Sequence, residues 1–171
     1  IDFYKMICNI PKDNYVTKKT FKSQLLQKSI FTSFQIQKKD KKILKTFLEN
    51  NLDCISQKLI KCDHITQYFK SKKDNCDIDL LSFPNDSAVI TIDSLVTNNS
   101  SGMSAFFVSS IKYLNGDDVY IQSKCPHITA FVPEGCSPKD SLDFVSKKDS
   151  SVTIIPYKAS FTVKGRYHTR K

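Results

Sequence analysis

The sequence has no apolar run of about 18 residues, no signal-peptide pattern at its start and no tight cysteine framework. A helix that spans a membrane needs such a run, so we expect no membrane partner. Without a signal peptide, the protein is predicted to be intracellular, in the cytoplasm or the nucleus. We therefore expect reduced cysteines, as intracellular thiols usually are. They are Cys8, Cys54, Cys62, Cys76, Cys125 and Cys136.

Acidic residues are fewer than basic ones, 17 against 26, which gives a net charge of +9 and a pI near 9.2. A basic chain often binds polyanions, although a soluble lysine-rich surface would explain the excess equally well. At 171 residues, with 40% hydrophobic content, 12 Phe and 7 Tyr, the chain can bury a core. That length predicts one domain, or two lobes that share a core. Because the chain begins at Ile1, we expect it to be a fragment of a longer protein.

Histidine is also scarce, but two of the three histidines lie in a repeat. Residues 61–66 and 124–129 both read Lys-Cys-x-His-Ile-Thr, and an aromatic residue follows two positions after each Thr. Side chains alternate along a strand, so the His and Thr of each copy would share one face, with Ile on the other. If the two halves pack symmetrically, one cleft would collect four polar groups. These are His64, Thr66, His127 and Thr129.

That set of groups suits phosphodiester chemistry. A histidine has an unperturbed pKa of about 6.5, so two of them can serve as base and acid near neutral pH. Threonine hydroxyls can donate hydrogen bonds to phosphate oxygens, on which charge develops in the transition state. The scheme requires no metal and no other cofactor.

The motifs His64-Ile65-Thr66 and His127-Ile128-Thr129 resemble those of the two-histidine (2H) phosphoesterase superfamily. Residues 126–135, which read PHITAFVPEG, are similar to the cyclic phosphodiesterase domain of fungal-type tRNA ligases. In those domains a "PHIT" strand leads into a Pro/Glu/Gly turn and a Ser-containing segment, here Ser137 to Ser141.

The resemblance implies a two-lobed α+β fold of mostly antiparallel sheets flanked by helices, with a central cleft. It also implies opening of a 2′,3′-cyclic phosphate at an RNA end to a 2′-phosphate and a free 3′-hydroxyl, with His64 as proton donor and His127 as acceptor. The expected partners are tRNA exon halves and covalently linked kinase and ligase domains. A binding module of the same fold without catalysis is the alternative.

Other residues near the motifs have competing interpretations. Tyr68 and Phe131 could stack on a nucleobase, as could Phe69, but aromatics after such strands are more often core. Cys62 and Cys125, each two residues before its His, could complete a Cys₂His₂ zinc site, although the spacing is unusually short. We interpret both as small buried residues.

Three further positions receive minor or no roles. Lys61 and Lys124 should face away from the histidines and at most attract phosphate. His168, near the chain end, receives no role.

The periodicities predict an α+β domain. Two helices are predicted. The first is capped by Asp40 and runs to about Ile55, and the second is capped by Ser137 with Pro138 at its first position. The helix from Asp40 should bury Ile43, Leu44, Phe47, Leu48 and Leu52, and that from Ser137 should bury Leu142, Phe144 and Val145. Apolar residues over 21–34 also have helical spacing, and residues 11–22 are predicted to form a loop. Strands are expected at 3–10, 59–69, 88–96, 103–112, 125–132, 152–155 and 160–167, with a turn at 115–118.

Overall fold

The computed structural model describes residues 29–53, 56–70 and 80–170. The strand expected at 3–10 and the loop expected at 11–22 lie outside these ranges. The strands are β1 (Ser29–Gln35), β2 (His64–Lys70), β3 (Ser87–Asn98), β4 (Ser104–Tyr113), β5 (His127–Phe131) and β6 (Val152–Arg170). The helices are α3 (Lys38–Asn51) and α4 (Ser141–Phe144), with 3₁₀ turns η2 (Gln57–Leu59) and η4 (Pro138–Asp140). Antiparallel strands with few helices confirm the coarse α+β class. In the described part of the chain, no helix is long and apolar enough to cross a membrane.

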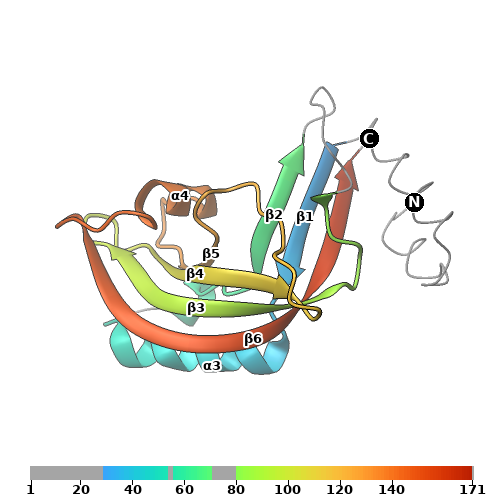
Figure 1. The fold of residues 1–171 in the computed structure, drawn as a ribbon. Coiled ribbons are helices and arrows are strands. Elements are labelled where there is room, and N and C mark those ends of the chain that lie inside the picture. The colour runs from blue at the N-terminus through green and yellow to red at the C-terminus, as the bar shows by residue number, and fades with distance from the viewer. Residues whose placement is uncertain (1–28, 54–55, 71–79, 171) are drawn as a thin grey trace, which may run out of the picture.

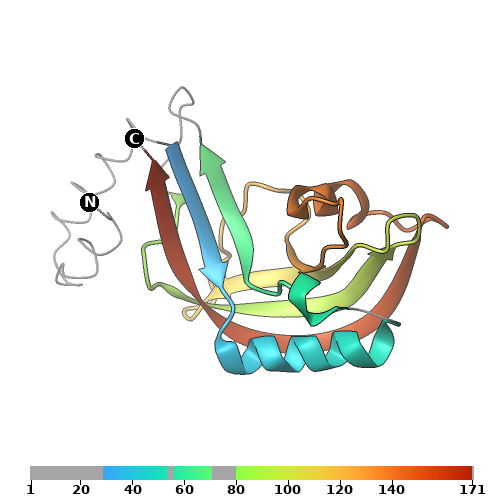
Figure 2. The same ribbon diagram turned by 180° about the vertical axis from the view of Figure 1, so that it is seen from behind.

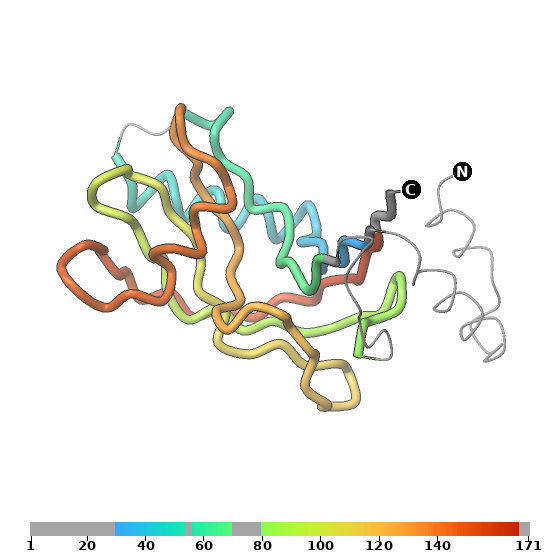
Figure 3. The backbone as a smooth tube through the Cα atoms, turned by 90° about the horizontal axis from the view of Figure 1, so that it is seen from above, coloured from blue at the N-terminus to red at the C-terminus, as the bar shows by residue number. Residues whose placement is uncertain are grey.

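The six strands form one closed barrel in the order β1-β2-β5-β4-β3-β6, and every neighbouring pair is antiparallel. Strand β6 closes it because it pairs with β3 over one part of its length and with β1 over another. Figures 1 and 2 show β1 and β2 rising from the curved layer of β3 and β4, with β6 running through both parts. Figure 3 shows the connection from β4 to β5 projecting as a loop from the rest of the described chain.

The prediction of two separate closing strands was wrong, since β6 is continuous from Val152 to Arg170. Pro156 lies between the two predicted strands and cannot donate a ladder hydrogen bond, which made it resemble a break. In the structure Pro156 pairs with Ser94, where the register of β3 shifts between Ile92 and Ser94. An irregularity of this kind is where a sheet tolerates proline.

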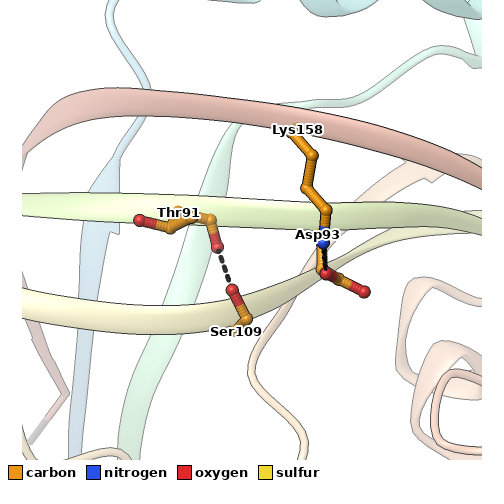
Figure 4. A network of polar contacts seen from close by, with 4 residues as sticks. All are labelled: Thr91, Asp93, Ser109 and Lys158. Atoms are coloured by element: carbon orange, nitrogen blue, oxygen red, sulfur yellow. Dashed lines mark hydrogen bonds and ion pairs between the residues drawn. The ribbon is translucent and has the colours of Figure 1, made fainter.

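The same irregularity carries exposed polar contacts that join three strands. Asp93, the residue skipped in the register, forms an ion pair with Lys158 of β6. Beside it, the Ser109 hydroxyl of β4 donates a hydrogen bond of 3.3 Å to the Thr91 carbonyl of β3 (Figure 4). A bulge bends a strand and increases its twist, so these contacts lie where the curved layer turns.

Helix α3 begins before the predicted cap and ends before Ile55. Its N-cap is Gln37, and Asp40 lies in the first turn, where a carboxylate complements the helix dipole. Leu52 is the C-cap residue. The predicted helix is therefore present, with its N-cap three residues earlier.

The apolar face of α3 packs along β6 (Figure 2). Leu44 and Leu48 are completely buried, and Phe47 stacks on Tyr157 of β6 with ring centroids 4.1 Å apart. Ile43 was predicted to be buried with them but is 49% exposed. It is the stripe's edge position, which the sheet does not reach.

Strand β1 replaces the C-terminal part of the helical spacing predicted over 21–34. Ile30 and Phe34 are fully buried, and Thr32 between them is also buried. Residues four apart share a face in a helix and in a strand, so this pair did not distinguish the two. Residues 29–35 form a strand because they pair with β2 on one side and with β6 on the other.

The remaining predicted elements are present with small changes of their bounds. Strands 88–96 and 103–112 are confirmed as the antiparallel pair β3 and β4. The turn at 115–118 is confirmed, with Gly116 at a φ of 93°. The motif strands begin later than predicted, at His64 and His127, because a 3₁₀ turn and irregular backbone precede the first.

Candidate active site

The two repeats meet side by side in the structure. Ile65 of β2 and Ile128 of β5 are antiparallel register partners, and both are fully buried in the main hydrophobic cluster. Neighbouring residues on each strand point to the opposite face. The polar residues that flank the two isoleucines therefore share the face away from the core.

Those four polar residues line one cavity of about 590 Å³. The antiparallel arrangement sets His64 beside Thr129 and Thr66 beside His127. The structure thus brings together the four residues that the sequence motif singled out. The cavity is also lined by Phe31, Lys61, Asp63, Gln67, Phe69, Gln122, Ser123, Pro126, Pro138, Lys139 and Leu142.

His127 has a defined tautomer. Its Nδ1 lies 2.9 Å from the Cys125 carbonyl oxygen. A carbonyl only accepts hydrogen bonds, so Nδ1 carries the hydrogen and Nε2 of the neutral ring has a free lone pair. Burial lowers the pKa of His127, because it disfavours the imidazolium, and the hydrogen bond to Cys125 opposes this in part. The ring is therefore neutral at physiological pH, with Nε2 able to accept a proton.

His64 is half-buried at the start of β2 and packs against β1. The edge-to-face contact with Phe31 has ring centroids 5.7 Å apart and an interplanar angle of 89°. The preceding residue, Asp63, also lines the cavity and forms an ion pair with Lys41 of α3. Strand pairing and this aromatic contact together orient the imidazole.

Thr129 is held by the segment that follows β5. Its Oγ1 lies 3.2 Å from the hydroxyl of Ser141, which is completely buried. Ser141 is the first residue of α4, the short helix labelled in Figure 1. The predicted capping of this segment is confirmed, since Ser137 and Asp140 form a reciprocal capping box. Leu142 was predicted to face inward but is 52% exposed at the cavity. The capped turn therefore both positions Thr129 and forms a wall.

Two of the three aromatic residues predicted to stack on a base, Tyr68 and Phe131, are not in the cavity lining. Tyr68 is 9% exposed and packs near Tyr120, with centroids 6.4 Å apart. Phe131 packs against the main hydrophobic cluster. Neither ring therefore lines the cavity that holds the histidines, and the role of these two residues in substrate binding stays a prediction.

A register shift explains which aromatics do line the cavity. The pairing of β1 with β2 passes from Thr32–Tyr68 to Ser33–Thr66, so Gln67 is an extra residue in β2. One extra residue reverses the alternation beyond it. Phe69 therefore lines the cavity instead of Tyr68, opposite its register partner Phe31.

Phe69 was predicted from the sequence as a residue that could stack on a base, but Phe31 was not. Only the register of β1 against β2 brings Phe31 to the cavity, and no local pattern encodes that register.

The two repeated lysines occupy different environments. Lys61 was predicted to face away from the histidines, but it lines the cavity. The next residue, Cys62, has a φ of 55°, which breaks the strand alternation between Lys61 and His64. Lys124 is exposed and is not part of the lining.

The two motif cysteines are not arranged with the histidines as a metal centre. Cys62 is completely buried in the main cluster, and burial, assisted by the nearby Asp63 charge, raises the pKa of its thiol to about 12. Cys125 is half-buried against a second cluster. No group of three or more His, Cys, Asp or Glu side chains that could hold a metal ion occurs among residues 29–53, 56–70 and 80–170.

The cavity lining therefore combines two imidazoles, two threonine hydroxyls, the aromatic pair Phe31 and Phe69, and two lysines. Comparisons with protein-family models, with curated proteins and with solved structures gave no match to this chain.

Proposed function

We propose that this chain is a metal-independent 2′,3′-cyclic phosphodiesterase that acts on RNA ends. The observation that carries the proposal is the pairing of Ile65 with Ile128, with both His-x-Thr motifs lining one cavity. Two imidazoles and two hydroxyl donors in one cavity are the groups that an in-line displacement at phosphorus needs.

In the proposed reaction His127 is the base. Its Nε2 takes a proton from a water molecule, whose oxygen attacks phosphorus and forms a new P–O bond. The bond from phosphorus to O3′ breaks, and His64 gives its proton to O3′. The product carries a 2′-phosphate and a 3′-hydroxyl. The Nδ1–H bond to Cys125 supports this assignment, because it leaves Nε2 of His127 as the acceptor.

Thr66 and Thr129 would donate hydrogen bonds to the two non-bridging oxygens of the phosphate. Charge on these oxygens rises in the transition state, so such donors accelerate the reaction. The hydrogen bond between Thr129 and Ser141 supports a preset orientation of one of the donors. For the substrate's base, Phe31 and Phe69 offer aromatic surfaces at the cavity.

We also propose that the fold is a two-lobed 2H phosphoesterase fold. One lobe would contain β1 and β2, the other would contain β3, β4 and β5, and β6 would run through both (Figure 1). The motif strands β2 and β5 would then form the seam between the lobes. Exon halves of tRNA, with kinase and ligase domains on the same chain, remain the expected context of such a domain.

The test is hydrolysis of an oligoribonucleotide with a 2′,3′-cyclic phosphate end. We expect His64→Ala and His127→Ala each to abolish turnover while circular dichroism and thermal unfolding stay near wild type. Lys124→Ala, an exposed residue outside the cavity, is the matched control and should retain full activity. Chelator should have no effect. Hydrolysis by a folded double histidine variant would refute the proposal.

The alternative is a domain that binds a nucleotide or an RNA end without chemistry. The aromatic pair Phe31 and Phe69 beside the polar groups would serve binding alone equally well. Under this alternative the wild-type protein binds the cyclic end but releases it unchanged. Identification of the product by chromatography separates the two functions directly.

A further inference from the structure

Two lysines of the cavity have no carboxylate partner in the described part of the chain. Asp63, which also lines the cavity, is paired with Lys41 of α3. Lys61 and Lys139 line the same cavity and form no ion pair within 4 Å among the described residues. The cavity thus carries an excess of positive charge next to the proposed phosphate site.

Both lysines are anchored at the Thr129 side of the site. The backbone N–H of Lys61 donates to the carbonyl of Ala130, 2.7 Å away, and so holds Lys61 alongside β5. Lys139 belongs to the capped turn that precedes Ser141, whose hydroxyl contacts Thr129. Their positions follow from hydrogen-bonded backbone rather than from a free loop.

Several cavity-lining residues follow one another along β2 and the residues just before it. Lys61 comes first, His64 and Thr66 follow, and Phe69 lies at the other end. The cavity volume of about 590 Å³ is within the range of about 300–1,000 Å³ for ligand sites, far more than one phosphate occupies.

A terminal nucleotide has the same order of groups. Its base leaves the ribose at C1′, the cyclic phosphate spans C2′ and C3′, and the chain continues through C4′ to the 5′-phosphate. With the base at Phe31 and Phe69 and the cyclic phosphate at the histidines, the 5′-phosphate would lie toward Lys61 and Lys139. Lysine ammonium groups are suitable donors for a phosphate diester.

We propose that Lys61 and Lys139 form a second anion subsite, which binds the phosphate on the 5′ side of the terminal nucleotide. This inference depends on the proposed function and deepens it. The substrate class becomes an oligonucleotide end, and a cyclic mononucleotide without a 5′-phosphate is a poor substrate because it leaves the subsite empty.

The experiment compares two substrates on four proteins. The substrates are a short oligoribonucleotide with a 2′,3′-cyclic end and a nucleoside 2′,3′-cyclic phosphate without a 5′-phosphate. The proteins are wild type, Lys61→Gln with Lys139→Gln, each single variant, and Lys124→Gln as control. Lys124 is the counterpart of Lys61 in the second repeat but lies outside the cavity lining.

The double variant should lower kcat/KM for the oligonucleotide by about tenfold or more, since one hydrogen bond to a charged group is worth about tenfold or more. Its kcat/KM for the mononucleotide should change by less than about twofold. The dependence of the oligonucleotide reaction on salt should weaken in the double variant, because fewer counterions are released on binding. Lys124→Gln should behave as wild type with both substrates.

Equal losses on both substrates, or no loss on the oligonucleotide, would overturn the subsite. If wild type hydrolyses neither substrate, the proposed function fails, and equilibrium binding then tests the subsite separately. The ligands for that measurement are a 3′-phosphorylated oligoribonucleotide and a nucleoside 3′-monophosphate. The subsite is supported if the double variant binds the oligonucleotide more weakly than wild type does but binds the mononucleotide equally well. It is overturned if binding of the oligonucleotide is unchanged.

Discussion

Replacement of Gln67 by leucine should be among the most destabilising single changes in the described part of the chain. Gln67 is 1% exposed, at the bulge of β2. Its Oε1 accepts hydrogen bonds from the Thr32 hydroxyl at 3.0 Å and from the Ser82 N–H at 3.3 Å. Its Nε2 donates to the Ser82 hydroxyl and to the Tyr120 carbonyl, both at 3.0 Å. The buried amide is thus fully hydrogen-bonded, and it joins β1, β2 and two connecting segments.

The size of the effect follows from the partners that Gln67→Leu would leave behind. The Ser82 hydroxyl keeps a contact with the Tyr113 hydroxyl. The Thr32 hydroxyl, the Ser82 N–H and the Tyr120 carbonyl lose the bonds described above. Thr32 and Ser82 are buried, whereas Tyr120 is 37% exposed, so two buried groups are left without a partner. An unsatisfied buried group costs about 1–3 kcal/mol, so the loss in the free energy of unfolding should be about 2–6 kcal/mol. That is a large part of the roughly 5–15 kcal/mol by which domains are stable.

Equilibrium unfolding in urea, followed by circular dichroism, measures this loss. The control is Gln122→Leu. Within residues 29–53, 56–70 and 80–170, the exposed Gln122 amide bonds only to the Phe69 backbone, so its loss should cost no more than about 1 kcal/mol. If Gln67→Leu fails to fold, Thr32→Val removes one bond of the network and should cost about 1–2 kcal/mol. A Gln67→Leu protein less than about 1 kcal/mol below wild type would refute the reasoning.

Four further predictions concern the pH dependence of stability, the pH dependence of the reaction rate, packing and surface charge. The folded-state pKa of His127 lies below its unfolded value, so the contribution of His127 to the free energy of unfolding should be fully present above a pH of about 6.5 and fall as the pH drops toward the folded-state pKa. Urea midpoints measured against pH should show this fall, and His127→Gln should lessen it. In the pH–rate profile, kcat/KM should likewise decline on the acid side as His127 becomes protonated, and a base-side requirement for its protonated form would contradict its role as acceptor. Gly165→Ala should destabilise by about 1–3 kcal/mol in thermal or urea unfolding, since a Cβ there would lie 2.8 Å from the Phe83 carbonyl oxygen. Lys158→Ala should cost less than about 1 kcal/mol, because its pair with Asp93 is exposed, and a larger loss would show that the bulge depends on it.

The features predicted correctly from sequence are those that local chemistry determines. The strands β3 and β4 follow from β-branched alternation, and the cap at Ser137 follows from the positions of Pro138 and Asp140. The convergence of the four motif residues was also predicted, because a duplicated motif implies equivalent positions in two halves. None of these conclusions needed the register between distant strands.

The errors about which of Lys61, Tyr68 and Phe69 line the cavity have a common physical origin in irregular backbone. Nothing in the sequence marks Gln67 as an extra residue in β2, yet this one position decides that Phe69 rather than Tyr68 faces the cavity. The φ of 55° at Cys62 has no sequence signature either, because cysteine has no preference for that region. It moves Lys61 into the cavity lining. Strand alternation was the correct rule, and it failed only across these two residues.

The symmetry of the site raises a chemical problem that the same backbone irregularity helps to resolve. An antiparallel pair of identical His-Ile-Thr segments is locally two-fold symmetric about Ile65 and Ile128, so the motifs alone would make the imidazoles equivalent. Acid–base catalysis requires them to differ. The Cys125 carbonyl accepts the Nδ1–H of His127, whereas Cys62, the counterpart of Cys125, has a left-handed φ and is buried in the core. The two histidine environments therefore differ in the backbone conformation of the preceding cysteine and in the residue between it and the histidine, Asp63 in one copy and Pro126 in the other. Under the proposed mechanism, two identical His-Ile-Thr segments could accordingly supply one base and one acid.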